Sequence, residues 1–330
     1  MSSRTLFTGV CTLLSTTALF AGLAVAGTLP TAGPNRPANV PEGYVITPAG
    51  YFHSSCVVHL KNGDILHSSE KFIEHADGSF DSAPVCAYAH FSPTGERIEA
   101  DAVNPLTGEE MTRGSRQPTI SHAWIEYASA KTSSSYGGLF AEWKVPATPT
   151  TKSGQTIFLF PGMEDYADVV TILQPVLGWN SDFASAWGIA SWNCCVSGTV
   201  YEATPQRVSV GDTIAGYVFS NCAAGTLTCS SWYLLALDST TGVYSQFTNT
   251  GNFGQTFNWA FAGALEVYNV SQCGNYPAGS STSFSSLELE NDKFVQYSNP
   301  GWAFTNSSSG LTPQCSYGGS VSAATVTLKY

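Results

Sequence analysis

A long succession of short apolar runs separated by turn residues extends from Ala123 to the C-terminus, and it constrains the fold more than any other feature. No part of this stretch repeats apolar residues with the 3.6-residue period of a helix. Many short strands with closely spaced turns indicate an antiparallel sandwich rather than βαβ units. We therefore predict an all-β fold, a two-sheet antiparallel β-sandwich of jelly-roll type. The predicted strands are Leu139–Val145, Thr156–Phe160, Val169–Leu177, Ala186–Trp192, Arg207–Val210, Thr213–Ser220, Trp232–Asp238, Phe257–Val270 and Ala323–Leu328.

A small β region is predicted before the sandwich. Short β-like runs alternate with turns from residue 43 to about 102, and Asn62-Gly63 separates two of them, Cys56–Leu60 and Ile65–His67. An Asn-Gly step between apolar runs predicts a hairpin. The expected organisation is a leader and small β region over residues 27–120, a candidate propeptide, followed by the sandwich domain over residues 121–330. Arg113 and Arg116 form a candidate processing site, although an ordinary polar loop explains them equally well.

The first 26 residues have the pattern of a secretory signal peptide. Arg4 precedes a mostly apolar stretch that closes on the small residues Ala24-Val25-Ala26. Threonine and serine interrupt this stretch, and no later segment is long and apolar enough to span a bilayer. We expect residues 1–26 to be removed and the mature protein to be secreted, extracellular and free of the membrane.

The cysteine count agrees with export. Eight cysteines follow the signal peptide, and an even number in a secreted chain is typical of disulfides. Cys56–Cys86 and Cys222–Cys229 are the first pairs to expect, because each could close a local hairpin or loop. The cysteines lack the paired C-x-x-C spacing of zinc sites. Asn269 and Asn306 each begin a glycosylation acceptor triplet, as in many exported glycoproteins.

The charge balance excludes one class of partner. The net charge is −11 with only 13 basic residues, whereas nucleic-acid binding requires a basic surface. We expect no nucleic-acid partner, and we expect a monomer.

The distribution of histidine limits the possible chemistry. All six histidines lie within the first 122 residues, so the stretch from Ala123 onward has none. This excludes a Ser-His-Asp or Cys-His arrangement, and a histidine-based metal site, built from that stretch alone. If the sandwich domain is catalytic, its proton-transfer group should be a carboxylate.

Two polar residues stand out in apolar strands. Glu266 lies in the run Trp259–Tyr268, and strand alternation predicts that it shares a face with Ala262, Ala264, Tyr268 and Val270. An acidic side chain in such surroundings should have a raised pKa, as many general acids and bases do. Gln174 is a neutral amide in the apolar run of residues 171–177. Each alone also fits a satisfied core polar group or an edge residue.

Six short motifs follow one another along the sandwich domain, and their order resembles that of a known family. They are Glu142-Trp143-Lys144-Val145-Pro146, Phe158-Leu159-Phe160-Pro161-Gly162-Met163-Glu164, Ile172-Leu173-Gln174, Ala190-Ser191-Trp192, Val210-Gly211-Asp212-Thr213-Ile214 and Leu265-Glu266-Val267-Tyr268. The order resembles the fungal glutamic peptidases called eqolisins, whose fold is a double-sheet β-sandwich of concanavalin-like or jelly-roll type. Neprosin-type glutamic peptidases share the sandwich and carry an N-terminal prosegment, which residues 27 to about 120 resemble in position.

The resemblance implies a secreted, acid-acting glutamic endopeptidase that hydrolyses a polypeptide substrate with no metal or organic cofactor. Gln174 and Glu266 occupy the positions of the catalytic pair. Glu266 would activate a water molecule and return its proton to the leaving amine. The Gln174 amide would donate a hydrogen bond to the oxyanion, a contribution of ~2.7–4 kcal/mol. Trp143, Glu164 and Trp192 would shape the substrate-binding cleft.

The chain also departs from the family's motifs. Phe160 replaces a tryptophan, Glu164 an aspartate, Ser191 a glutamate, and Pro175-Val176 the Thr-Gly that follows the catalytic glutamine.

Two other functions remain open at the level of sequence. One is a carbohydrate-binding, lectin-like sandwich in which tryptophans serve as stacking platforms. The other is a glycoside hydrolase that uses Glu164 and Glu266 as paired carboxylates, which would need their carboxyl groups ~5–9.5 Å apart. The candidate stacking residues are Trp143, Trp179, Trp187 and Trp192.

Overall fold

The computed structural model describes Leu29 and residues 36–67, 72–84, 86–98, 124–167, 171–194, 198–251, 254–309 and 313–330. The predicted signal peptide and the candidate processing site at Arg113 and Arg116 lie outside these residues. Where the structure is described, strands dominate and helical structure is confined to short turns such as the 3₁₀ turn Ser54–Cys56. No helix among the described residues is both long and apolar enough to cross a membrane.

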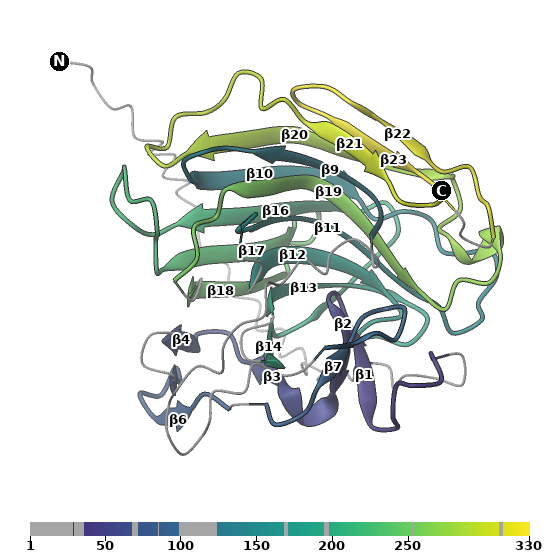
Figure 1. Cartoon of the computed structure of the whole chain (residues 1–330), viewed down its shortest axis with the longest axis horizontal. Helices are drawn as coiled ribbons and strands as arrows, with labels where there is room; N and C mark the ends of the chain where they lie inside the picture. The colour runs from purple at the N-terminus through teal and green to yellow at the C-terminus, as the bar shows by residue number, and fades with distance from the viewer. Residues whose placement is uncertain are drawn as a thin grey trace, which may run out of the picture.

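Two stacked, mainly antiparallel sheets form the sandwich, which confirms the predicted fold class (Figure 1). In the described residues, one sheet has seven strands in the order β18-β17-β16-β10-β20-β23-β22. The strands of this sheet are β10 (Tyr136–Lys144), β16 (Thr213–Ser220), β17 (Trp232–Asp238), β18 (Tyr244–Thr250), β20 (Ser281–Asn291), β22 (Gly318–Val321) and β23 (Val326–Lys329).

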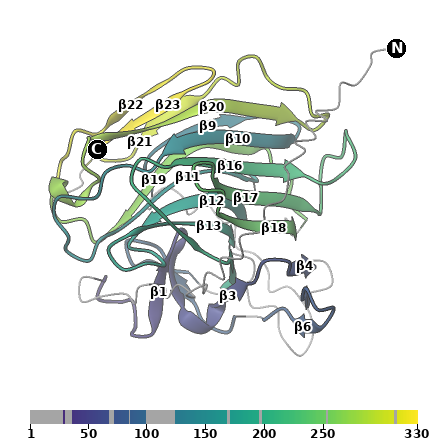
Figure 2. The ribbon, with the colours of Figure 1, turned by 180° about the vertical axis from the view of Figure 1, so that it is seen from behind.

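The second sheet has nine strands among the described residues, in the order β21-β9-β19-β11-β12-β13-β14-β3, with β15 paired to β13. Figure 2 shows both sheets from behind. The strands of the nine-stranded sheet are β3 (Val57–Leu60), β9 (Trp124–Lys131), β11 (Thr156–Glu164), β12 (Ile172–Trp179), β13 (Trp187–Cys194), β14 (Val200–Ala203), β15 (Gln206–Val208), β19 (Trp259–Tyr268) and β21 (Ala303–Asn306).

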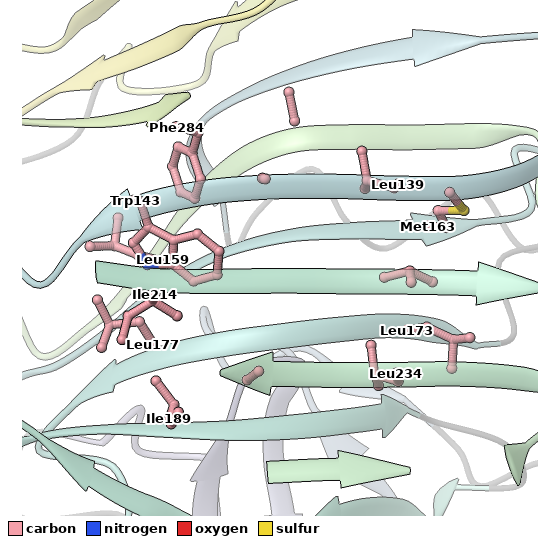
Figure 3. Packing of buried hydrophobic residues seen from close by; sticks show 14 of the residues in the cluster. Leu139, Trp143, Leu159, Met163, Leu173, Leu177, Ile189, Ile214, Leu234 and Phe284 are labelled. Atoms are coloured by element: carbon pink, nitrogen blue, oxygen red, sulfur yellow. The ribbon is translucent and has the colours of Figure 1, made fainter. Parts of the chain in front are cut away.

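The main hydrophobic core lies between these two sheets. Because successive side chains of a strand point to opposite faces, alternate residues of the nine-stranded sheet, such as Leu173 and Leu177, point inward. They meet Trp143, Ile214 and Leu234 of the seven-stranded sheet (Figure 3). All five side chains are buried, and each contributes ~1.5–3 kcal/mol relative to an exposed position.

Gly216 marks a point where the two sheets approach closely. A Cβ placed there would come within 2.8 Å of Pro175 Cγ and 2.9 Å of Trp143 Cζ3. We expect Gly216→Ala to lower the free energy of unfolding by about 1–3 kcal/mol, because overpacking forces side chains off their rotamers. Denaturant unfolding followed by tryptophan fluorescence measures the change. A neutral substitution would mean that the sheets are not packed this closely.

The N-terminal region contributes a strand to the large sheet, which differs from the prediction. The turn at Asn62-Gly63 is present, since the amide of Asp64 donates to the carbonyl oxygen of Lys61. The runs on its two sides do not form a hairpin, however. Strand β3 pairs in parallel with β14, and β4 (Ile65–His67) pairs with β5. The hairpin prediction was therefore wrong, because a distant sheet edge offers β3 its backbone partners.

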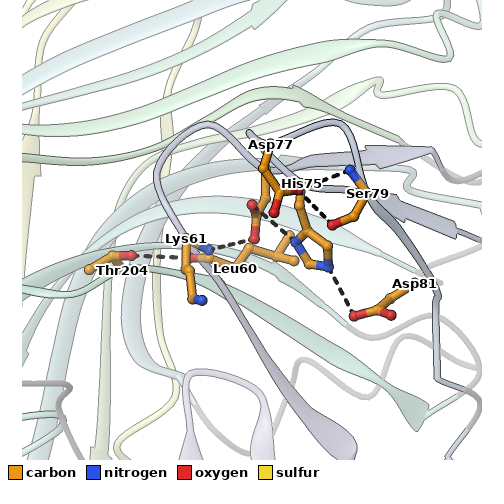
Figure 4. Close-up of polar contacts among 8 residues, drawn as sticks. Leu60, Lys61, His75, Asp77, Ser79, Asp81 and Thr204 are labelled. Carbon is orange, nitrogen blue, oxygen red and sulfur yellow. Dashed lines mark hydrogen bonds and ion pairs between the residues drawn. The ribbon is translucent and has the colours of Figure 1, made fainter.

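Two small sheets complete the N-terminal region. One has the order β1-β2-β7-β8 and the other the order β4-β5-β6. Beside the second of these sheets, His75 contacts Asp64 at 3.2 Å and Asp81 at 2.9 Å; Figure 4 shows the contact between His75 and Asp81. These hydrogen bonds raise the pKa of His75. The remaining strands are β1 (Tyr44–Thr47), β2 (Gly50–His53), β5 (Phe72–Glu74), β6 (Phe80–Ser82), β7 (His90–Phe91) and β8 (Arg97–Ile98).

The disulfides confirm both pairs expected from the sequence. Cys56–Cys86 closes a loop of the N-terminal region, and Cys222–Cys229 closes a short loop after β16. A further bridge joins Cys273 to Cys315. Of these three bridges, none links residues 36–98 to the sandwich domain.

Candidate active site

The candidate site lies on the outer face of the nine-stranded sheet, the face that points away from the seven-stranded sheet. Its apolar residues include Phe158, Phe160, Val176 and Phe261, which form a second buried cluster. Side chains of the N-terminal region, among them those of β1, β2 and β7, complete this cluster. Figure 1 shows these strands beside β13 and β14. The N-terminal region therefore covers part of the face that carries the candidate residues.

Gln174 lies in the middle of this face. It pairs with Trp192 of β13, and Trp192 in turn pairs with Glu202 of β14, so the three residues form one row across adjacent strands. Gln174 is fully buried, and neither its Oε1 nor its Nε2 has a hydrogen-bond partner among the described residues. A buried amide without partners costs a few kcal/mol. Such a group is a candidate for binding a water molecule or a substrate.

Glu164 is the nearest carboxylate along the neighbouring strand. It pairs with Ile172, two residues from Gln174, which makes Glu164 and Gln174 diagonal neighbours on the same face. Diagonal neighbours have Cα atoms about 7–8 Å apart, within reach of long side chains. Gly162 pairs with Phe261 and adds no side chain there; a Cβ at Gly162 would come within 3.4 Å of Gln174 Cγ.

The electrostatic environment of Glu164 is unusual. The residue is fully buried, and neither carboxyl oxygen has a partner in the described part of the chain. Burial raises its pKa well above the ordinary value, and the nearby charge of Asp165 acts in the same direction, whereas Lys131 opposes the shift. Glu164 and Gln174 thus place a proton-binding group and an amide side by side, both without protein partners.

Glu266 lies on the same face as Gln174 but is displaced from it along the strand direction. Its partner on β11 is Phe158, whose partner on β12 is Gly178, four residues along the strand from Gln174. Four residues span about 13 Å, and the two strand spacings from β19 to β12 add about 10 Å across the sheet. The structure does not bring Gln174 and Glu266 into contact. The β19 residue in the same cross-strand row as Gly162 and Gln174 is Phe261.

Glu266 has partners of its own. The Tyr268 hydroxyl oxygen lies 2.5 Å from its Oε1, within hydrogen-bond distance, and the Trp124 side chain also hydrogen bonds to the carboxyl group. Burial nevertheless raises the pKa of Glu266 to about 8, as expected for an acid in apolar surroundings. The Tyr268 hydroxyl also lies 2.9 Å from the carbonyl oxygen of Thr47 in the N-terminal β1–β2 hairpin. That hairpin therefore packs directly beside Glu266.

Bulges explain why the register differs from the one expected. The pairing of β19 with β9 shifts between Phe261 and Gly263, and that of β11 with β19 shifts between Phe160 and Gly162. A bulge inserts one extra residue and breaks the alternation of faces. Ala262 consequently packs in the inner core instead of sharing the face of Glu266, which corrects that prediction. Val270, beyond the end of β19, also packs against the inner core.

The three residues expected to shape the cleft have different locations. Trp192 and Glu164 lie on the outer face, on either side of Gln174. Trp143 does not: it is buried between the two sheets, with its ring 5.3 Å from that of Phe284 (Figure 3). The prediction for Trp143 was wrong because β10 belongs to the opposite sheet and turns this side chain inward.

The geometry also weighs against the two other functions. Three of the four candidate stacking tryptophans, Trp143, Trp179 and Trp187, pack in the core between the sheets, so none of these three presents a ring face to a sugar. Glu266 is level with Phe158, six residues along β11 from Glu164. That is about 20 Å of strand, much more than the ~5–9.5 Å that paired glycosidase carboxylates require.

A second group of buried carboxylates was missed from the sequence. Glu202 is fully buried, and its Oε2 lies 2.7 Å from Nδ1 of His59 on β3. Burial raises the pKa of Glu202 to about 7, and burial together with the charge of Glu202 raises that of Asp182 well above its usual range. Burial lowers the pKa of His59. The sequence feature that could have identified this group is the position of Glu202 within the otherwise apolar run of residues 200–203.

No family model and no curated protein matches the chain. Among solved structures, it is similar to scytalido-glutamic peptidase bound to a peptide-based transition-state analogue, with 16% identity and a TM-score of 0.47 over 63% of this chain and 98% of that one. It is also similar to SCP-B, described as a member of the eqolisin family, in complex with the tripeptide Ala-Ile-His, with 17% identity and a TM-score of 0.45 over the same shares of the two chains.

A third similar structure is aspergilloglutamic peptidase from Aspergillus niger, with 18% identity and a TM-score of 0.33 over 53% of this chain and 98% of that one. At this level of similarity the assignment of a function depends on the site itself.

Proposed function

We propose that this chain is a secreted glutamic-type endopeptidase whose reacting groups are Gln174 and a buried glutamate, with Glu164 as the first candidate. One observation carries the proposal: a fully buried amide and a fully buried carboxyl group lie on adjacent strands, and neither has a partner among the described residues. Buried polar groups are normally paired, so this pair fits a site that holds a water molecule and a peptide carbonyl. The disulfides agree with an exported protein.

The chemistry follows from the two groups. In the ionised form, the Glu164 carboxylate takes a proton from a water molecule as the water oxygen adds to the peptide carbonyl carbon. The Gln174 Nε2–H donates a hydrogen bond to the carbonyl oxygen, which becomes negatively charged. Glu164 then gives the proton to the amine nitrogen while the C–N bond breaks. Because burial is the main cause of the raised pKa of Glu164, water that enters an opened cleft would lower this pKa and increase the ionised fraction.

Glu266 remains the second candidate for the same carboxylate role. Its burial and its pKa of about 8 suit a general acid or base. Its distance from Gln174, however, means that the two side chains could act together only after a change in the arrangement of the strands. The two carboxylates can be distinguished by mutation.

We also propose that the N-terminal β region acts as a prosegment. The β1–β2 hairpin hydrogen bonds to Tyr268 beside Glu266, and β3 occupies an edge of the sheet that carries the site. None of the three described disulfides would hold this region in place after the chain is cut between residues 98 and 124. After cleavage there, the contacts that retain this region in the described part of the chain would be non-covalent.

The test is cleavage of a denatured protein substrate between pH 2 and 7 by the purified secreted chain and its variants. We expect Glu164→Gln and Gln174→Ala each to reduce kcat/KM by at least about 10²-fold, the usual contribution of a general base or an oxyanion donor. Glu288→Gln, which changes an exposed glutamate of the opposite sheet, is the matched control and should retain activity.

The variants separate the possible outcomes. Full activity in Glu164→Gln together with a loss in Glu266→Gln would assign the carboxylate role to Glu266. Undiminished activity in Gln174→Ala would contradict the proposed site altogether. A complete lack of cleavage by the wild-type chain at every pH, before and after removal of residues 27–120, would contradict the peptidase function.

A further inference from the structure

An exposed lysine is held at the border of the Glu164 site by two aromatic rings. Lys131 is the last residue of β9, and its side chain is exposed. Its Nζ lies 3.1 Å from the centre of the Tyr166 ring and 4.6 Å from that of Trp259. The two rings contact each other edge-on with centroids 5.2 Å apart. Cation–π contacts of this kind restrain an otherwise mobile ammonium group.

The sheet register ties this lysine to the candidate site. Glu164 pairs with Trp259, and Trp259 pairs with Lys131, so the three residues form one row on the outer face across β11, β19 and β9. The row passes from a buried carboxyl group through a ring that is 6% exposed to an exposed ammonium group. Tyr166, which is 48% exposed, lies at the same border. Lys131 and Tyr166 therefore form the solvent-exposed end of this row.

The two groups at the exposed end of this row, the Lys131 ammonium and the Trp259 indole N–H, are hydrogen-bond donors, whereas the unpartnered acceptors belong to Glu164 and Gln174. Trp259 Nε1 is buried and has no partner in the described residues, and the same holds for Gln174 Nε2. Within those residues Lys131 has no carboxylate oxygen within 4.0 Å, although the chain has 24 acidic residues and only 13 basic ones. An indole N–H and an ammonium group can only donate. The complementary ligand is consequently rich in acceptors and negatively charged.

We propose that Lys131, Trp259 and Tyr166 form a subsite for an acidic side chain of a peptide substrate, an inference that rests on the proposed function. The ligand carboxylate would accept a charge-assisted hydrogen bond from Lys131 Nζ, and one of its oxygens could accept from Trp259 Nε1. The Tyr166 ring holds the ammonium group in position. Aspartate or glutamate at one position of the substrate would thus be preferred over the corresponding amides.

Binding is measured separately from cleavage, so that failure of the subsite differs from failure of the peptidase function. The full secreted chain carrying Glu164→Gln is titrated with two peptides that differ only in one glutamate or glutamine, with intrinsic tryptophan fluorescence as the readout. We expect the glutamate peptide to bind about five- to tenfold more tightly, as for a partly buried charge pair. The same pair of peptides is then compared as substrates of the chain with native Glu164.

Variants of Lys131 test whether the preference depends on its charge. Lys131→Met should remove the preference, Lys131→Arg should retain most of it, and Lys131→Glu should reverse it in favour of a peptide with lysine at that position. A purely structural lysine would produce no such reversal. Lys144→Met, which removes a lysine from β10 in the opposite sheet, is the matched control and should leave the preference unchanged.

Each outcome decides the question. A preference for glutamate that depends on Lys131 supports the subsite even if no variant cleaves peptides, in which case only the peptidase proposal fails. Equal binding of the two peptides, no binding of either, or a preference that survives Lys131→Met overturns the subsite, whether or not cleavage occurs.

Discussion

The free energy of unfolding should be largest near pH 4 and should fall steadily as the pH rises towards 8. The cause is a set of buried carboxyl groups that retain their protons in the folded state. The pKa of Glu266 is raised from 4.5 to about 8 and that of Glu202 from 4.5 to about 7, in both cases chiefly by burial. Burial raises the pKa values of Glu164 and Asp182 well above their ordinary values in the same way.

The free energy of unfolding falls with pH because the folded and the unfolded chain release these protons at different pH values. Below pH 4.5 both the folded and the unfolded chain hold these protons, so the stability is fully present. Between pH 4.5 and the folded-state pKa only the unfolded chain ionises, and each such group then costs the folded state about 1.4 kcal/mol per pH unit. For Glu266 this loss continues to about pH 8 and for Glu202 to about pH 7. His59, whose pKa is lowered, acts in the opposite direction and reduces stability below about pH 6.5.

Differential scanning calorimetry from pH 4 to pH 8 measures this dependence. Several groups acting together should lower Tm by about 10 °C or more over that range, since 1 kcal/mol corresponds to roughly 2–4 °C for a domain of this size. Glu266→Gln cannot ionise and should flatten the slope, whereas the exposed substitution Glu288→Gln should leave it unchanged. A Tm that is constant, or that rises towards pH 8, would show that these carboxyl groups are not buried in neutral form.

Gly50→Ala should release the N-terminal hairpin from the outer face and destabilise the protein by about 3 kcal/mol. Gly50 has a φ of +124°, which L residues rarely adopt, and a Cβ there would lie 2.3 Å from the carbonyl oxygen of Phe91. A backbone oxygen cannot move away as a flexible side chain can, so strain and overlap add together. The β1–β2 hairpin would have to separate from β7, and the carbonyl of Thr47 would lose its contact with Tyr268.

Hydrogen exchange of the hairpin amides measures the release of the hairpin, and thermal unfolding measures the loss of stability. Gly78→Ala is the matched control, because Gly78 also has a positive φ of +81° but a Cβ there would meet nothing within 4 Å. The Gly78→Ala variant should lose only about 1 kcal/mol of its free energy of unfolding through backbone strain. Equal losses in both variants, with unchanged exchange in the hairpin, would show that the contact between Gly50 and β7 does not hold the hairpin in place.

Local patterns predicted much of the secondary structure. Alternation over Thr213–Ser220 and Trp232–Asp238 matched β16 and β17, because each of these strands buries one face in the core. The predicted strand Thr156–Phe160 was too short, since β11 continues to Glu164 through Pro161 and Gly162. Pro161 lies at the bulge, where a missing N–H is tolerated. The strand Trp124–Lys131 was not predicted, although it carries Lys131 of the proposed subsite.

The candidate site could be predicted only in part. Gln174 and Glu266 were identified because each is a polar residue in an apolar run, and both are indeed fully buried. Their separation could not be foreseen, because it depends on bulges in β11 and β19. The pairing of Glu164 with Trp259, and of Trp259 with Lys131, also joins residues that are distant in the sequence.

The sequence by itself determined the all-β class, two of the disulfides and the absence of histidine from the sandwich domain. These properties depend on composition and on patterns within a few residues, which the chain carries before it folds. The tertiary structure decided which carboxylate lies beside Gln174, which tryptophan faces outward, and that β3 joins the edge of the large sheet. Those outcomes depend on register between distant strands, where one extra residue in a bulge moves a side chain from one face of the sheet to the other.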